Sequence, residues 1–208
     1  AANAAYSVDL VVSCPKGMPL EVRGRSGRTT VLGMAGPVKL LQAEGDVTVE
    51  RVAGDMDLRV DKGSLLAADC TGGLLANAAG GRVETRNGQG KQGLFVRQAK
   101  TIIDAPRKDV TVRSTDGDVK IMALDGIGGT YDVEVAKGNL NLMMHPESDA
   151  LLFITVERGQ VNVNNGLNLT GTVGKDVQTF QGKMKDGTHR VVLVVKDGNV
   201  AIDGQATP

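Results

Sequence analysis

The chain has 208 residues, is 41% hydrophobic but only 2% aromatic, and carries no net charge at pH 7. A neutral chain has no overall field that attracts nucleic acid or an anionic membrane, and the sequence holds no apolar run near the roughly 20 residues that span a bilayer. We therefore expect no nucleic-acid partner, no membrane insertion, and a core built from aliphatic side chains.

Residues 1–18 are expected to form an N-terminal cap. They contain an apolar stretch that ends at Val12, and Pro15 and Pro19 follow it. A terminal strand has an unpaired edge that other chains can use, and proline blunts such an edge because it lacks a backbone N–H. The regular units are expected to begin at residue 19.

Residues 19–168 contain a repeat in which glycine returns every nine residues. Glycine occupies eight consecutive positions of this frame, from Gly27 to Gly90, and two later insertions of three residues shift its phase. A fixed internal period of this kind indicates a solenoid. The expected corner glycines are Gly27, Gly36, Gly45, Gly54, Gly63, Gly72, Gly81, Gly90, Gly117, Gly126, Gly138, Gly159 and Gly198.

Each nine-residue unit is predicted to form one short strand and one corner. Apolar residues stand at its second and fourth positions, as in Val47 and Val49 or Met56 and Leu58. Such alternation is typical of a strand with one buried face, and glycine supplies the positive φ that a tight corner requires. We predict an all-β fold, a single-stranded β-helix or β-solenoid with about two units per coil. Three units per coil, which would give a triangular cross-section, are the alternative.

Residues 169–189 leave the nine-residue frame, and residues 190–203 return to it. We expect the first segment to be a protruding loop or hairpin and the second to be the last coil of one domain spanning residues 1–208. Cys14 and Cys70 would then lie about three coils apart, beyond the Cα separation of about 7 Å that a disulfide allows. Both are expected to be free thiols.

Several short motifs resemble catalytic or ligand sites, but their surroundings do not. GQGKQG, residues 88–93, matches the glycine pattern of dinucleotide-binding loops, yet a strand pattern and not a helix follows it. The only histidines, His145 and His189, have no cysteine at a ligand spacing. Asp55 and Asp57 lack the glycine–aspartate pattern of calcium-binding rolls. We expect no catalytic residues, no cofactor and no metal site.

Two surface features are candidates for contact with a partner. Residues 44–69 contain seven acids and three bases, whereas residues 82–108 contain seven bases and two acids, so neighbouring coils differ in charge. Near the C-terminal end, apolar residues occupy outward positions of adjacent coils, and such residues mark a contact more often when they form a patch. The loop expected at residues 169–189 could cover this patch instead. The candidate interaction residues are Met122 and Met143 on one face of adjacent coils and Phe153, Val192 and Val194 on the other face.

Several long stretches share the pattern of one known family: VDLVVSCPKGMPLEVRGRSGRTTV, VRSTDGDVKIMALDG, HPESDALLFITVERGQVNV and VVLVVKDGNVAID. From about Tyr6 to Asp203 the chain resembles the bacterial DUF4097-type β-solenoid family, an adhesin domain of unknown function with some eukaryotic organellar relatives. The resemblance implies a non-enzymatic β-helix that is exported, periplasmic or on the cell surface. A mitochondrial location after removal of a transit peptide is the alternative.

Three functional hypotheses follow. The first is a non-catalytic binding or scaffolding module that presents flat strand faces to a protein or glycan partner. The second is a structural accessory subunit of a larger complex, for example an organellar one. The third is a β-helix enzyme that acts on a polysaccharide, which would need a line of carboxylates that the sequence lacks. The partner and the oligomeric state do not follow from the sequence.

Overall fold

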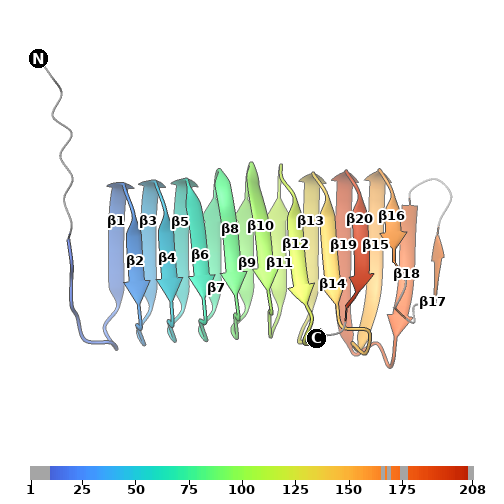
Figure 1. Ribbon diagram of the computed structural model, residues 1–208, viewed down its shortest axis with the longest axis horizontal. Coiled ribbons are helices and arrows are strands. Elements are labelled where there is room, and N and C mark those ends of the chain that lie inside the picture. Colours follow the sequence, from blue (N-terminus) through green and yellow to red (C-terminus); the bar gives the residue numbers. More distant parts are fainter. Residues whose placement is uncertain (1–9, 165–166, 168–169, 174–177, 206–208) are drawn as a thin grey trace, which may run out of the picture.

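Alternating apolar and polar residues fold the chain into two facing β-sheets, which the computed structural model describes for residues 10–164, 167, 170–173 and 178–205 (Figure 1). No helix occurs among these residues. The larger sheet contains β1 (Leu20–Ser26), β3 (Val38–Glu44), β5 (Met56–Lys62), β7 (Leu74–Ala78), β9 (Gln92–Val96), β11 (Val110–Ser114), β13 (Tyr131–Lys137), β15 (Ala150–Arg158), β17 (Thr170–Val173), β18 (Gln178–Met184) and β19 (His189–Asp197). The smaller sheet contains β2 (Thr29–Leu32), β4 (Val47–Glu50), β6 (Ser64–Ala68), β8 (Gly81–Arg86), β10 (Ala99–Asp104), β12 (Val119–Ala123), β14 (Leu140–Met144), β16 (Val161–Val163) and β20 (Val200–Gly204).

Each coil contains one strand of each sheet. In the larger sheet Val38 of β3 pairs with Met56 of β5, and Met56 pairs with Leu74 of β7. These parallel partners are 18 residues apart, and the insertion at residues 127–129 lengthens one later coil to 21 residues. The registers confirm the predicted all-β solenoid with two nine-residue units per coil.

Aliphatic side chains fill the space between the sheets. Leu40, Leu58 and Leu94 belong to one column of the larger sheet and are fully buried. Val49 of the smaller sheet is also fully buried, whereas its neighbour Thr48 points outward and is half-buried. Burial of one such aliphatic side chain contributes about 1.5–3 kcal/mol. The inward register predicted from the alternation is therefore confirmed.

The corner glycines fall into two classes, and the predicted reason for glycine holds for only one of them. Gly63 has a φ of +131°, a conformation that side chains disfavour. Gly54 has no positive φ, but a Cβ on it would overlap the backbone carbonyl of Gly36 in the preceding coil. The positive-φ prediction is thus wrong for one column of corners, where glycine is needed because neighbouring backbones approach closely. The members of that column are Gly36, Gly54, Gly72 and Gly90. The other corner glycines named above have positive φ: Gly27, Gly45, Gly63, Gly81, Gly117, Gly126, Gly138, Gly159 and Gly198.

The coils follow chain order only as far as β14. In the larger sheet β19 lies between β13 and β15, and in the smaller sheet β20 lies between β14 and β16. Residues 190–203 are therefore the last coil along the chain but not along the solenoid axis (Figure 1). Side-chain amides join the three coils at one corner: Asn199 N donates to Asn139 Oδ1 at 3.1 Å, and Gln160 N donates to Asn199 Oδ1 at 3.0 Å.

The segment expected as a protruding loop or hairpin includes two strands. β18 runs antiparallel to β15, from Ala150 opposite Met184 to Val156 opposite Gln178, and β17 runs antiparallel to β18. The described part of residues 169–189 therefore continues the larger sheet at its C-terminal end. Residues 168–169 and 174–177 lie outside the described part of the chain.

Both cysteines are free thiols, as predicted. Cys14 Sγ lies 3.8 Å from Met34 Sδ, and Cys70 Sγ lies 3.2 Å from the carbonyl oxygen of Ala68. Met34 and Val52 follow one another at the same corner of successive coils, because Ala53 N donates to the carbonyl of Met34. Cys70 occupies the next coil of this corner, since Thr71 N donates to the carbonyl of Val52. The predicted separation of about three coils is confirmed.

Candidate functional site

The five apolar residues singled out in the sequence lie on two opposite faces. Met122 of β12 pairs with Met143 of β14 in the smaller sheet. Phe153 of β15 pairs with Val192 of β19 in the larger sheet, and Val194 lies two residues further along β19. All five side chains are half-buried. The structure therefore brings them together as two groups and not as one surface.

The group around Phe153 is partly covered by a charged side chain. The guanidinium carbon of Arg190 lies 5.3 Å from the centre of the Phe153 ring, a distance at which a cation is attracted to the ring face. The segment that could have folded over this group does not do so at β18, because β18 lies beside β15 in the plane of the sheet. The ring is therefore engaged within the chain.

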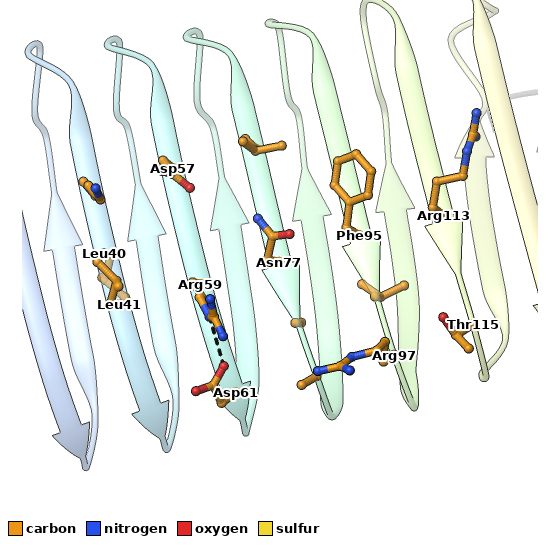
Figure 2. A pocket seen from close by; sticks show the side chains of 15 residues that line it. Leu40, Leu41, Asp57, Arg59, Asp61, Asn77, Phe95, Arg97, Arg113 and Thr115 are labelled. Atoms are coloured by element: carbon orange, nitrogen blue, oxygen red, sulfur yellow. Dashed lines mark hydrogen bonds and ion pairs between the residues drawn. The ribbon is translucent and has the colours of Figure 1, made fainter.

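A hollow that the sequence did not predict lies on the outer face of the larger sheet, over β3, β5, β7, β9 and β11 (Figure 2). It is open to solvent and has a volume of about 630 Å³. Leu75 and Phe95 line it, and each remains 43% exposed, although side chains of this size are usually buried. Gly93 lies between them: a Cβ there would be 3.4 Å from Leu75 Cδ1 and 3.8 Å from Phe95 Cε2. The glycine thus keeps the space between the two apolar side chains open.

Three arginines border the hollow, and they differ in how they are paired. Arg59 binds Asp61 at 3.2 Å, the interaction drawn in Figure 2. Arg113 binds Asp132 at 2.7 Å, and this hydrogen bond raises the pKa of the Arg113 guanidinium. Among the described residues no hydrogen bond or ion pair engages the side chain of Arg97. Arg97 is therefore the arginine of this hollow that remains available to a partner.

The sequence did contain a signal for this hollow. Phe95 stands between buried Leu94 and Val96, so the alternation assigns it an outward position, and Leu75 follows buried Leu74 in the same way. The alternation that assigns Met122 and Phe153 to outward positions therefore also assigns Leu75 and Phe95 to them. The spatial order of the strands, which makes them neighbours across β7 and β9, follows directly from the repeat.

The remaining motifs have structural roles in the described residues. Residues 88–91 lie in the corner between β8 and β9, and residues 92–93 begin the strand β9. Asp55 Oδ1 accepts a hydrogen bond from Gly73 N at 2.9 Å in the next coil, and His145 Nδ1 accepts one from Glu147 N at 3.1 Å. Within the described ranges no group of three or more His, Cys, Asp or Glu side chains could hold a metal ion. The same ranges contain no helix with the length and apolarity needed to cross a membrane.

The basic block at residues 82–108 is partly neutralised within its own strand. Glu84 accepts hydrogen bonds from Arg82 at 2.6 Å and from Arg86 at 2.5 Å on the outer face of β8. Burial raises the pKa of Glu84, and the two arginine hydrogen bonds lower it by more, so the pKa lies below its usual range. The Glu84 cluster therefore leaves less free charge on the smaller sheet than the sequence suggests.

Comparison with known proteins agrees with the fold. No curated protein and no solved structure matches the chain. The family model described as Toastrack DUF4097 matches residues 7–203, which is nearly the whole chain and includes every strand of the solenoid. The family has a β-solenoid structure and no known function. The chain belongs to the Toastrack DUF4097 family.

Proposed function

We propose that the protein is a non-catalytic, adhesin-like binding module and that the hollow on its larger sheet receives a protein partner. The observation that carries this proposal is the exposure of Leu75 and Phe95 on neighbouring strands, with the unpaired guanidinium of Arg97 directly after the strand of Phe95. The exported and organellar locations both remain part of the proposal.

The composition of the hollow supports a protein partner. Aromatic and arginine side chains are enriched at the centres of protein interfaces and contribute much of their binding energy. A partner side chain that fits between Leu75 and Phe95 would bury apolar surface, and a carboxylate beside it would pair with Arg97. We therefore infer a partner that presents an apolar side chain next to an acidic one. A glycan would use the Phe95 ring as a stacking platform, but it would leave the charge of Arg97 without a counter-ion.

The ionisable groups of the hollow support a binding role over catalysis. Asp61 is held by Arg59, and Arg113 is held by Asp132. A general acid–base pair needs one group with a pKa near the working pH and within hydrogen-bond reach of the reacting atoms. Among the described lining residues, Asp57 is the one carboxylate without an ion pair, and no histidine or cysteine lines the hollow beside it to form such a pair. The lining therefore favours recognition.

The test places a photo-crosslinking residue at position 95, in cells of the natural source, and compares it with the same residue at Lys120 on the outer face of the smaller sheet. We expect a protein adduct from position 95 and not from position 120. With the partner so identified, Phe95→Ala and Arg97→Glu should each weaken binding about tenfold or more, whereas Lys120→Ala should not.

Two results would contradict the proposal. Equal crosslinking at positions 95 and 120 would show that the hollow has no special role. Binding of a glycan that is lost in Phe95→Ala but unchanged in Arg97→Glu would replace the protein partner with a carbohydrate. Because Phe95 is 43% exposed, Phe95→Ala should leave the melting temperature nearly unchanged, which separates lost binding from lost folding.

A further inference from the structure

The two ends of the solenoid differ in the strands that follow their outermost coils. At the C-terminal end β18 covers the edge of β15, and Gln178 Oε1 accepts a hydrogen bond from Val161 N of β16 at 2.8 Å. At the N-terminal end β1 has only β3 as a neighbour and β2 has only β4 (Figure 1). Among the described residues, β1 and β2 therefore both have a bare outer edge at the N-terminal end, whereas at the other end the bare outer edges are those of β17 and β16.

The free edge of β1 has a defined set of unpaired groups. Leu20 N donates to the carbonyl of Pro37 at 2.9 Å, so Leu20 directs its N–H toward β3. In a regular strand, alternate residues direct their backbone groups to opposite edges. The N–H and C=O groups of Glu21 and Arg23 therefore point away from the solenoid. The described segment at residues 10–15, which passes beyond β1, forms no strand with it.

Exposed apolar side chains gather at the same end. Of the eight exposed large hydrophobic residues in the described chain, five belong to the first coil or to the segment before it. Val11 is 90% exposed and Leu10 82%, and Met18 and Leu32 are each 52% exposed. Val12 and Leu32 line one shallow hollow there. A patch of this kind, beside bare strand edges, favours association with another chain.

We propose that this N-terminal end is a self-association surface, at which β1 of one copy pairs antiparallel with β1 of a second copy. Centred on Val22, the pairing places Glu21 of each copy opposite Arg23 of the other, and Leu20 opposite Gly24. Glu21 and Arg23 are exposed on the outer face, where they already lie 2.7 Å apart within one copy. A register shifted by one residue in each copy would place Arg23 opposite Arg23, so charge selects the register centred on Val22.

The occupant is a second copy in head-to-head orientation because the opposite end of the larger sheet offers β1 a poorer match. Head-to-tail stacking would pair the seven-residue β1 with β17, which has four residues and none that is charged to meet Glu21 or Arg23. A two-fold arrangement uses the same edge from both copies and closes after two. The larger sheets then continue from β3 and β1 of one copy into β1 and β3 of the other. This surface is separate from the hollow around Phe95 and does not depend on its function.

Charge reversal tests the proposal by analytical ultracentrifugation of the full chain, whose monomer mass is 21.7 kDa. The unmodified protein should sediment as a dimer of twice that mass. Glu21→Arg and Arg23→Glu should each place like charges opposite one another and raise the dimer dissociation constant about tenfold or more. The double exchange of Glu21→Arg with Arg23→Glu restores opposite charges and should restore the dimer. Arg59→Glu, which breaks a similar exposed pair on β5, is the matched control and should leave the mass unchanged.

Three outcomes overturn the proposal. The first is a monomer at all concentrations up to about 0.5 mM, which is beyond any useful protein–protein affinity. The others are a dimer that Glu21→Arg does not weaken and a double exchange that does not restore the dimer. If the protein is monomeric, hydrogen exchange of the Glu21 and Arg23 amides reports whether a segment of the same chain covers the edge. Equal melting temperatures of all four variants show that a change in mass is not a loss of fold. Phe95→Ala should not change the mass, which keeps this result independent of partner binding in the hollow.

Discussion

The coils from β1 to β14 stack in chain order, whereas the coils from β15 to β20 do not. Both regions use parallel strands, aliphatic interiors and glycine corners, so the difference does not come from the repeat itself. At the corner where the order changes, hydrogen bonds of Asn139, Asn199 and Gln160 join three successive coils in the order β14, β20, β16. The repeat defines what a coil is, but it does not define which coil is its neighbour.

The largest expected effect comes from removing the coil that links the two regions. A stop after residue 188 deletes β19 and β20, and with them five fully buried side chains. These are Val191, Leu193, Val195, Val200 and Ile202. The free energy of unfolding in urea should fall by more than about 5 kcal/mol, or the protein should become insoluble. Deletion of residues 1–13, which precede β1 in the sequence, should change it by less than about 1 kcal/mol. Similar losses in both truncations would contradict the interior position of the last coil.

Glycine-to-alanine substitutions test whether the corners work alike in both regions. Gly63 and Gly198 combine positive φ with a Cβ position that overlaps a neighbouring backbone carbonyl, and each Ala variant should lose more than about 3 kcal/mol. Gly54→Ala is destabilised only by the close approach of a neighbouring backbone. Gly27 has φ +110° and open space around its Cβ, so Gly27→Ala is destabilised only by conformational strain. Gly27→Ala should therefore cost only about 1–2 kcal/mol. If Gly27→Ala matched Gly63→Ala in thermal melts, backbone stacking would not be the reason for glycine.

The hydrogen bonds of Asn199 give a smaller effect that belongs to the second region. Asn199→Ala removes the acceptor for Gln160 N and the donor to Asn139 Oδ1, and should reduce the free energy of unfolding by about 1–2 kcal/mol. Gln160→Ala keeps the backbone N–H that makes the contact, so it should cost less than about 0.5 kcal/mol. If the coils stacked in chain order, Asn199 would lie in the last coil. Asn199→Ala and Gln160→Ala would then reduce the free energy of unfolding by similar amounts.

The smallest effect is a dependence on pH in the first region. The folded-state pKa of Glu84 lies below its unfolded value, because hydrogen bonds from Arg82 and Arg86 outweigh burial. The resulting stabilisation is complete above the unfolded pKa and is lost as the pH falls through the folded value. Glu84→Gln should therefore cost about 1 kcal/mol at pH 7 and almost nothing at pH 2, measured by urea unfolding at both pH values. Glu134→Gln, on the more exposed pair with Lys196 across β13 and β19, should cost less than about 0.5 kcal/mol at either pH. A larger pH dependence for Glu134→Gln would reverse this comparison.

The sequence predicted the features that depend only on the residues within one nine-residue unit. Alternation identified Val49 as buried and Thr48 as outward, and the nine-residue period identified the two-unit coil. It misassigned the role of Gly54, because the carbonyl that a Cβ on Gly54 would overlap belongs to Gly36 in another coil. The local residue pattern around Gly54 does not indicate that contact. The order of the coils could not be predicted from the sequence for the same reason. Phe95 was within its reach, since its outward position follows from the alternation.

The interior position of the C-terminal coil affects the order in which the chain can fold during its synthesis. A ribosome releases residues 189–204 after β13 to β16, yet these residues separate β13 and β14 from β15 and β16. Until they emerge, the nascent chain presents an open strand template at β13 and a second alternating segment, β15, that could pair with it out of order. Early pairing of this kind would have to be undone before β19 and β20 could enter, as in other slow-folding proteins with distant strand partners. A translational pause or a chaperone that acts before residues 189–204 emerge would therefore influence the yield of native protein more than one that acts on the first coils.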